Sequence, residues 1–191
     1  EQKIMKTRTF GGDHVEIRLT GDYFDDTLTE AKAWCDEAGG HFLPPFDHPD
    51  IIEGQASVAV ELLDQAHAQG FGTPDVIVMP VGGGGLSAGM TAYLTEAAPA
   101  TALRYVEPAG GASLTAALAE GAPVSLTRVD SFVDGAAVAR IGAHTFERLA
   151  HVPPQDVLAA PENRICGTIL EMLNIEGIVL EPAGALSIDV L

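Results

Sequence analysis

The sequence is poor in basic residues, and this scarcity excludes several classes of function. Ten lysines and arginines stand against 27 aspartates and glutamates, which gives a formal net charge of −17 over 191 residues. Such a chain repels the phosphate backbone of nucleic acids and offers no basic patch to an anionic membrane. We therefore predict that neither nucleic acid nor a membrane is a partner.

Long apolar runs and closely spaced cysteines are also missing. No hydrophobic stretch approaches the ~20 residues that cross a membrane, and the opening residues lack the pattern of a signal peptide. Cys35 and Cys166 are far apart and belong to no CxxC or Cys/His spacing. We predict a soluble, cytoplasmic protein with reduced thiols, no disulfide and no metal site.

The two ends of the chain lack the usual boundary signals. No methionine opens the sequence at Glu1, and the closing pattern ALSIDVL stops before any glycine, asparagine or proline. We expect the chain to be part of a longer protein.

Strand-like and helix-like segments alternate along the chain. The expected strands are residues 15–19, 41–43, 76–79, 103–106, 157–158 and 178–180. The expected helices are residues 28–38, 51–69, 86–97, 113–119 and 161–173. This order predicts an α/β protein with a mainly parallel, twisted sheet flanked by helices.

Two local patterns refine this prediction. The run from Pro44 to Asp50 contains three prolines, so we expect irregular structure there and interpret it as a domain border. In the helix that follows, Val58, Leu62 and Ala66 recur at helical spacing and are expected to share the buried face.

The stretch VIVMPVGGGGLSAGMTAYL joins an apolar strand to a helix through four consecutive glycines, Gly82 to Gly85. A strand, a glycine-rich turn and a helix N-terminus together form an anion site, because backbone N–H groups converge there with the positive end of the helix dipole. A tight turn alone needs only one or two glycines. We therefore interpret this loop as a phosphate cradle.

Three kinds of phosphate ligand can be weighed from the residues. A P-loop is excluded, because it requires a lysine after the glycines and none follows Lys32. A dinucleotide site is supported by the spacing of Gly83, Gly85 and Gly89 and by Glu107, which lies where an acid would bind the ribose. A small phosphorylated cofactor held by neutral backbone is the third possibility.

A family resemblance favours the third possibility. The motif MPVGGGGLSAG, residues 79–89, resembles the tetraglycine loop of the pyridoxal-phosphate serine/threonine dehydratases, and within that family the chain is most similar to the biosynthetic threonine dehydratases. The other blocks that carry the resemblance, in chain order, are KIMKTRTFGGDHVEIRLTGDYFD, PFDHPDIIEGQ, YVEPAGGASL, FVDGAAVARIG and ENRICGTILEMLNIEGIVLEPAGALS. The resemblance covers essentially the whole chain.

The resemblance implies a fold and a division into domains. The family has a two-domain, tryptophan-synthase β-like fold, also called pyridoxal-phosphate fold type II, of which this chain would be incomplete at both ends. Residues 1–52 would form the C-terminal part of the small domain. Residues 53–191 would belong to the large, cofactor-binding domain.

The resemblance also implies a cofactor and the residues that hold it. The cofactor is pyridoxal 5'-phosphate. Its phosphate would accept hydrogen bonds from the backbone of the loop, and two further positions would line the cofactor pocket. The residues inherited in this way are Gly82, Gly83, Gly84, Gly85, Leu86, Gly135 and Glu181.

The reaction implied by the resemblance is β-elimination, which converts L-threonine to 2-oxobutyrate and ammonia in isoleucine biosynthesis. The partner would be a small amino-acid substrate, and the full-length protein is expected to form a homo-oligomer. The family's Schiff-base lysine lies in a Ser-x-Lys-x-Arg-Gly block that this sequence does not contain, so we expect no catalytic residue in this chain and no activity from it alone.

Three alternatives stay open at this point. The chain could derive from a serine dehydratase or racemase of the same family, which would differ only in substrate. It could be a dinucleotide-binding oxidoreductase module, which would use Glu107 on the ribose. It could also be a catalytically inactive structural or regulatory protein.

Overall fold

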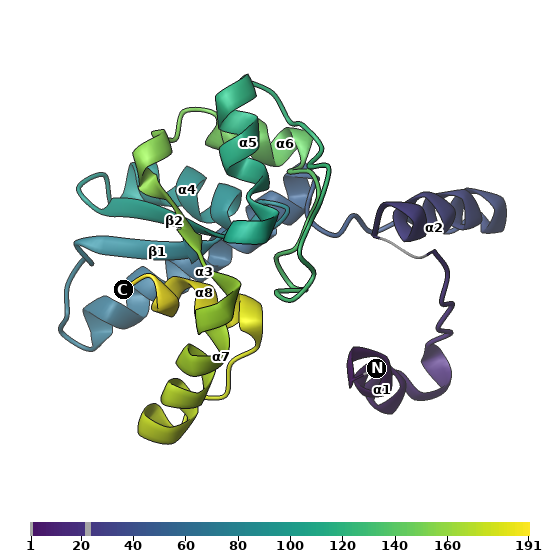
Figure 1. Cartoon of the computed structure of the whole chain (residues 1–191), viewed down its shortest axis with the longest axis horizontal. Coiled ribbons are helices and arrows are strands. Elements are labelled where there is room, and N and C mark those ends of the chain that lie inside the picture. Colours follow the sequence, from purple (N-terminus) through teal and green to yellow (C-terminus); the bar gives the residue numbers. More distant parts are fainter. Residues whose placement is uncertain (1, 22–23) are drawn as a thin grey trace. The chain divides into compact units, whose positions relative to one another are not determined.

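The computed structural model describes residues 2–21 and 24–191, which divide into two compact units (Figure 1). The first unit ends at Leu43 and the second begins at Pro44. In the described residues, no helix combines the length and the apolar character required to cross a membrane.

The first unit is built from two helices with little buried surface. They are α1 (Gln2–Gly11), continued by a 3-10 turn at Gly12–His14, and α2 (Phe24–Ala38). No residue of α1 is buried, and Cys35 in α2 is the single buried side chain among those described in this unit. The predicted end of α2 is confirmed, since Gly39 follows it with a φ of +67° that favours glycine.

The two strands predicted for the first unit are wrong. Residues 15–19 and 41–43 join no sheet in the part of the chain that the structure describes. Val15 has the extended backbone angles of a strand, but its side chain and that of Leu19 are exposed, by 42% and 70%. Alternation of apolar residues sets which face each side chain takes, whereas a strand also needs a neighbour for its hydrogen bonds. The break predicted at Asp22 lies outside the described residues.

The second unit contains a three-stranded parallel sheet, as the sequence predicts. Its strands are β1 (Val76–Pro80), β2 (Ala102–Pro108) and β3 (Val157–Ala160), in the spatial order β1-β2-β3. Val76 pairs with Ala102 at the start of β1, and Tyr105 pairs with Val157 at the start of β3. The carboxyl ends of all three strands therefore meet at one edge of the sheet.

Helices cover both faces of this sheet. They are α3 (Pro49–Ala68), α4 (Gly85–Ala97), α5 (Ser113–Glu120), α6 (Ala143–Leu149), α7 (Glu162–Glu171) and α8 (Pro182–Asp189). Shorter turns lie at Ala109–Gly111, Pro154–Asp156 and Met172–Glu176. Ile77 and Met79 of β1 pack into a core with α3, α4, α5 and α6, while Val106 of β2 packs into a second core with α7 and α8. The result is a three-layer α/β arrangement.

Several predicted boundaries in the second unit need correction. The helix predicted from Ile51 begins at Pro49, because proline fits the first helical turn and the ring of His48 accepts a hydrogen bond from the Asp50 amide. Its buried face contains Ile52, Ala59 and Leu63, whereas Val58 is 44% exposed. The predicted face is therefore rotated by about one position.

The C-terminal predictions are only partly correct. The helix predicted to run from Pro161 to Leu173 begins after Pro161 and ends at Glu171, where a π-helical turn takes over. The strand predicted at residues 178–180 is absent from the described sheet, and Val179 is 82% exposed. Helices α6 and α8 were not predicted.

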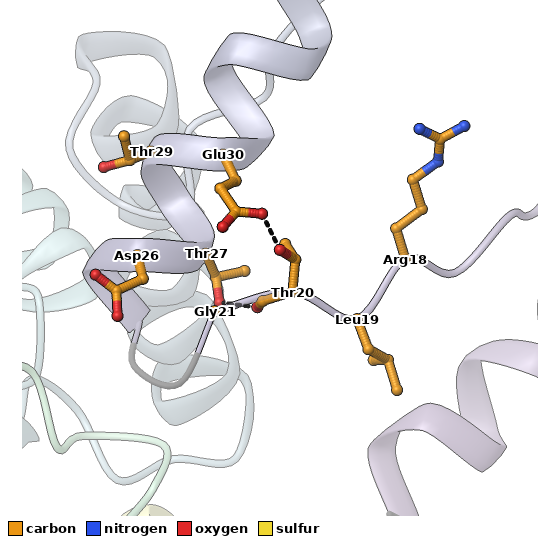
Figure 2. A pocket seen from close by; sticks show the side chains of 8 residues that line it. All are labelled: Arg18, Leu19, Thr20, Gly21, Asp26, Thr27, Thr29 and Glu30. Atoms are coloured by element: carbon orange, nitrogen blue, oxygen red, sulfur yellow. Dashed lines mark hydrogen bonds between the residues drawn. The ribbon is translucent and has the colours of Figure 1, made fainter.

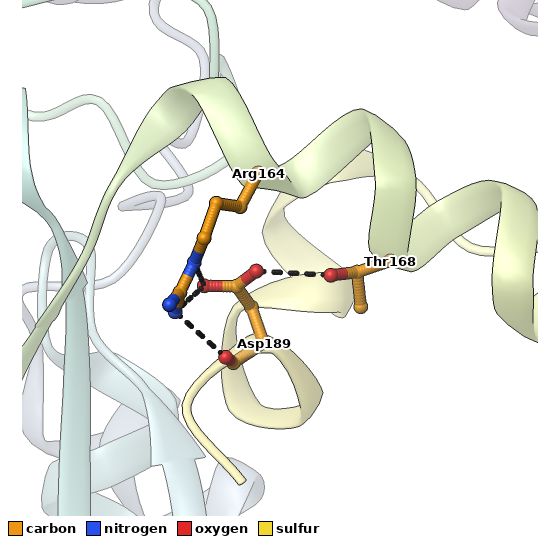
Figure 3. A network of polar contacts seen from close by, with 3 residues as sticks. All are labelled: Arg164, Thr168 and Asp189. Carbon is orange, nitrogen blue, oxygen red and sulfur yellow. Dashed lines mark hydrogen bonds and ion pairs between the residues drawn. The ribbon is translucent and has the colours of Figure 1, made fainter.

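A polar cluster joins α7 to α8 (Figure 3). The guanidinium of Arg164 donates hydrogen bonds to the carboxylate of Asp189, at 2.7 Å, and to its main-chain carbonyl, at 2.9 Å. The hydroxyl of Thr168 donates to the other carboxylate oxygen at 2.9 Å. Only 3% of the Asp189 side chain is exposed. These contacts hold the end of α8, the helix that begins directly after Glu181.

Candidate functional site

The four glycines form the turn between β1 and α4, at the carboxyl edge of the sheet. The amide of Val81 still donates to the carbonyl of Val106 at 2.8 Å, so the β1–β2 pairing reaches the start of the loop. Gly84 has a φ of +90°, a conformation that favours glycine, and α4 begins at the next residue. In open parallel sheets, ligands bind at this edge.

The remaining glycines are required by the packing of the protein itself. A Cβ atom added at Gly82 would lie 2.9 Å from the Cα of Ala136, and one added at Gly83 would overlap the ring of Phe46. At Gly85 the nearest atom would be the Cβ of Phe46, at 3.1 Å. The number of glycines therefore reflects close neighbours on the protein side of the loop as well as its turn.

Three carbonyl groups of the loop are held by protein donors. The carbonyl of Gly82 accepts from the hydroxyl of Ser113 at 3.4 Å, and that of Gly84 accepts from the amide of Ala88 at 2.8 Å. The carbonyl of Gly83 accepts from the hydroxyl of Thr145 at 2.8 Å. In a trans peptide the C=O and the following N–H point in opposite directions. The amides of the residues that follow these carbonyls therefore point away from the donors.

The amides of the loop have the properties of an anion site. Among the described residues, no protein acceptor takes a hydrogen bond from the amides of residues 82–86. The first N–H groups of α4 also lack partners within the helix, and the helix dipole adds partial positive charge at this end. Backbone alone can thus bind a phosphate group here, without a charged side chain.

Gly135 and Glu181 lie against each other, as two residues of one pocket would. A Cβ atom added at Gly135 would be 3.1 Å from a carboxylate oxygen of Glu181 and 2.9 Å from the Cβ of Ala183. Glu181 is the N-cap residue of α8, yet its side chain makes no capping hydrogen bond. The next residue after Gly135 is Ala136, which contacts Gly82. The structure therefore brings the loop, the turn at Gly135 and Glu181 together.

Glu107 has a different role from the one considered for a dinucleotide. Its side chain is fully buried and accepts hydrogen bonds from the amides of Leu114, at 2.6 Å, and Thr115, at 2.9 Å. The hydroxyl of Thr115 donates to it at 2.8 Å. Burial raises the pKa of this carboxyl group, and the hydrogen bonds oppose the rise. Glu107 caps the N-terminus of α5, so its assignment as a ribose ligand is wrong.

The first unit has an open hollow of its own, with a volume of about 840 Å³ (Figure 2). The polar groups that line it largely bind one another: the Thr20 hydroxyl contacts Glu30, and the hydroxyl of Thr27 donates to the carbonyl of Thr20 at 2.7 Å. Arg18 is paired with Glu16, at 2.7 Å. None of the predicted site residues belongs to this hollow.

Sequence reasoning missed three side chains that contact the glycine loop: Phe46, Ser113 and Thr145. Each lies far from the loop in the sequence, and no periodicity or motif links it to the glycines. The block PFDHPDIIEGQ offered a weak signal, because its residues resemble the family although they begin in a segment without regular structure.

Comparison with known proteins identifies a family. A family model described as pyridoxal-phosphate dependent enzyme matches residues 1–191. The chain is 42% identical over 190 residues to the biosynthetic L-threonine dehydratase of Bacillus subtilis and 44% identical to that of Lactococcus lactis. All of this chain is covered in both alignments, against 44% and 45% of the relatives.

Solved structures agree with these relatives. The processed form of threonine deaminase isoform 2 from Solanum lycopersicum matches with a TM-score of 0.86 and 34% identity, over 98% of this chain and 52% of that one. A bacterial-type match, the T.th. threonine deaminase, has a TM-score of 0.89 and 28% identity, over 100% of this chain and 60% of that one. The chain thus spans less than half the length of the curated relatives. It belongs to the family of pyridoxal-phosphate dependent enzymes.

Proposed function

We propose that this chain is part of a threonine dehydratase and that residues 82–86 bind the phosphate of pyridoxal 5'-phosphate. The observation that carries the proposal is the set of loop amides at the N-terminus of α4, which have no protein acceptor among the described residues. A phosphate ester is the part of this cofactor that such a site fits, since it accepts several N–H bonds at once.

The juxtaposition of Gly135 and Glu181 supports the same cofactor. Both lie next to the loop, through the contact of Ala136 with Gly82. A side chain at Gly135 would collide with Glu181, so glycine allows the acid to occupy this position. We infer that Gly135 and Glu181 line the cofactor pocket, with Glu181 beside the part of the cofactor that extends from the phosphate.

The chemistry of elimination requires groups beyond the second unit. Pyridoxal phosphate supplies an electron sink that delocalises the charge left when the α-proton of an amino acid departs. The proton must pass to a basic amine, and the unit from Pro44 onwards contains no lysine, because Lys3, Lys6 and Lys32 all precede it. We therefore infer that this chain contributes cofactor binding and that it does not turn over L-threonine by itself.

The choice of L-threonine as substrate rests on the relatives. Proteins that are 42% and 44% identical to the chain are threonine dehydratases. Two serine racemases match at 22% and 23% identity, a level that carries only the fold. No residue of the described chain favours serine over threonine.

Cofactor binding can be tested on the 191-residue chain by NMR. We expect pyridoxal phosphate, added to ¹⁵N-labelled protein, to shift the amide resonances of Gly83, Gly84 and Gly85. Pyridoxal, which lacks the phosphate, is the matched control and should leave them unchanged. Glycine amides that respond to NAD and not to pyridoxal phosphate would overturn the proposal.

Substrate can be tested on the full-length protein that contains this chain. We expect it to form 2-oxobutyrate from L-threonine faster than pyruvate from L-serine at equal concentrations. The 191-residue chain, assayed beside it with saturating cofactor, should form neither product. Equal or faster turnover of L-serine would contradict the assignment to threonine.

A further inference from the structure

The segment that opens the second unit lies against the glycine loop. The ring of Phe46 occupies the space that a side chain at Gly83 would need, and its Cβ lies at the position next to Gly85. The chain then continues through Asp47 to His48, which caps α3. The proposed function uses neither Phe46 nor Asp47, although both are close to the loop.

Asp47 holds the N-terminus of α6. Its carboxylate accepts hydrogen bonds from the amides of Ala143 at 2.9 Å, His144 at 2.8 Å and Thr145 at 3.3 Å, which lie 96 to 98 residues further along the chain. A carboxylate at this position satisfies N–H groups that have no partner in the helix and interacts favourably with the helix dipole. A side chain at Gly142 would overlap Asp47, so the approach is close on both sides.

Thr145 passes this constraint on to the loop. Its side chain is fully buried, and its hydroxyl donates to the carbonyl of Gly83 at 2.8 Å. The amide of Gly142 is the second donor to the same carbonyl, at a longer 3.3 Å, and it belongs to the turn that Asp47 holds. Both donors to Gly83 therefore depend on the position of the first turn of α6.

The orientation of one peptide plane follows. Because the C=O of Gly83 and the N–H of Gly84 belong to the same trans peptide, holding the carbonyl toward Thr145 directs the amide to the opposite side. Gly84 also lies close to Thr145, since a Cβ added there would be 3.0 Å from the threonine side chain. Glycine is flexible, so without these contacts the peptide could rotate.

We propose that Asp47 and Thr145 are positioning residues that orient the Gly83–Gly84 peptide for the cofactor phosphate. The phosphate role rests on the proposed function, whereas the orientation of the peptide does not depend on it. Asp47 fixes the first turn of α6, Thr145 transmits that position through its hydroxyl, and the Gly84 amide faces the ligand in advance. Preorganised donors bind more tightly because less freedom is lost on binding.

The orientation can be tested without any ligand. Thr145→Val keeps the shape of the side chain and removes the hydroxyl donor. We expect it to move the Gly84 amide resonance and to speed hydrogen exchange at Gly84 about tenfold, because a buried carbonyl loses its shorter hydrogen bond. Thr145→Ser keeps the hydroxyl and should behave like the wild type.

Thr168→Val is the matched control, since it removes a threonine hydroxyl that donates at 2.9 Å to Asp189, in the cluster between α7 and α8. It should leave the Gly84 resonance and exchange rate unchanged while lowering thermal stability to a similar extent as Thr145→Val. The comparison separates orientation of the loop from general loss of stability.

Binding of pyridoxal phosphate provides the second measurement. We expect Thr145→Val and Asp47→Ala to weaken it about tenfold, and Thr168→Val to leave it unchanged. If Asp47→Ala does not fold, Asp47→Asn serves instead, because its amide oxygen can still accept a hydrogen bond but carries no charge.

The two measurements can fail separately. A Gly84 resonance and exchange rate that are the same in Thr145→Val as in the wild type would overturn the proposed positioning. Wild-type glycine amides that do not respond to pyridoxal phosphate would overturn the proposed function, and the ligand-free comparison would still decide whether Thr145 orients the peptide.

Discussion

The two units of the chain contain similar sequence patterns but differ in what those patterns produce. In the first unit, Val15 to Leu19 alternates as a strand should and remains unpaired, with Leu19 70% exposed. In the second unit, Val76 to Pro80 pairs with β2, and Met79 is 1% exposed. Both units form the helices predicted for them. Helices depend on local sequence, whereas strands depend on a neighbour.

The difference extends to the packing of side chains. The second unit contains two hydrophobic cores, one on each face of its sheet. In the first unit Cys35 alone is buried among the described side chains, while large apolar residues such as Phe10, Trp34 and Leu43 are exposed. We expect the stability of the second unit to depend on single side chains far more than that of the first.

The largest effect should come from matched leucine substitutions in the two units. Leu94→Ala removes a side chain that is 1% exposed, and should lower the free energy of unfolding by about 3 kcal/mol. Leu19→Ala should change it by less than about 0.5 kcal/mol. Urea unfolding measured by circular dichroism follows mainly the second unit, and fluorescence of Trp34, the sole tryptophan, follows the first. Equal losses for both variants would remove the contrast.

A second effect concerns the close packing of the loop. Gly83→Ala forces a methyl group against the ring of Phe46 and should cost about 2 kcal/mol of stability. In a Phe46→Ala background the clash disappears, so the same substitution should cost much less. A double-mutant cycle from chemical denaturation measures this coupling, and additive losses would show that the ring does not restrict Gly83.

The third effect is a pH dependence that originates at Glu107. Burial raises its pKa above the ordinary value of 4.5, so the folded state binds this proton more tightly than the unfolded state. The stability that this provides is fully present below 4.5 and is lost as the pH rises through the folded pKa. The unfolding free energy of the wild type, relative to Glu107→Gln, should therefore fall over that range.

At neutral pH, Glu107→Gln should itself cost about 1.5 kcal/mol, because an amide cannot accept from three donors as a carboxylate does. Glu61→Gln, on the exposed side of α3, controls for the loss of one negative charge. A difference that rises with pH would mean that the hydrogen bonds outweigh burial.

The smallest effect is an expected gain. Gly54 lies within α3, and a Cβ added there meets no atom within 4 Å. Gly54→Ala should raise the free energy of unfolding by about 0.7 kcal/mol, because alanine loses less backbone freedom in a helix. Thermal melting of this variant beside Gly83→Ala would show whether glycine is retained at residue 83 for contact and at residue 54 without one.

The sequence predicted the parts of the fold that depend on local information. The order β1, glycine loop, α4 and the parallel pairing with β2 and β3 are confirmed. The predicted strands at residues 15–19, 41–43 and 178–180 are wrong, since apolar alternation does not reveal whether a pairing partner exists. Helix α6 was missed because its seven residues are too few to show a clear period.

The candidate site was predictable to a similar degree. The phosphate and pocket roles of Gly82 to Leu86, Gly135 and Glu181 came from the motifs and stay predictions, and the structure brings these residues together. The hydroxyl of Thr145 and the carboxylate of Asp47 could not be found in this way. Their contacts join segments that are 62 and 96 residues apart, and only the folded chain brings them together.

A loop that binds phosphate through amides alone affects how ionic strength acts on ligand capture. The chain carries a net charge of −17, so an approaching phosphate ester is repelled at long range and attracted only when it reaches the hydrogen bonds of the loop. Salt screens the repulsion over the Debye length of about 10 Å at ~0.1 M and acts little on the short contacts. Association should therefore become faster as salt is added, opposite to the behaviour of sites built from lysine and arginine.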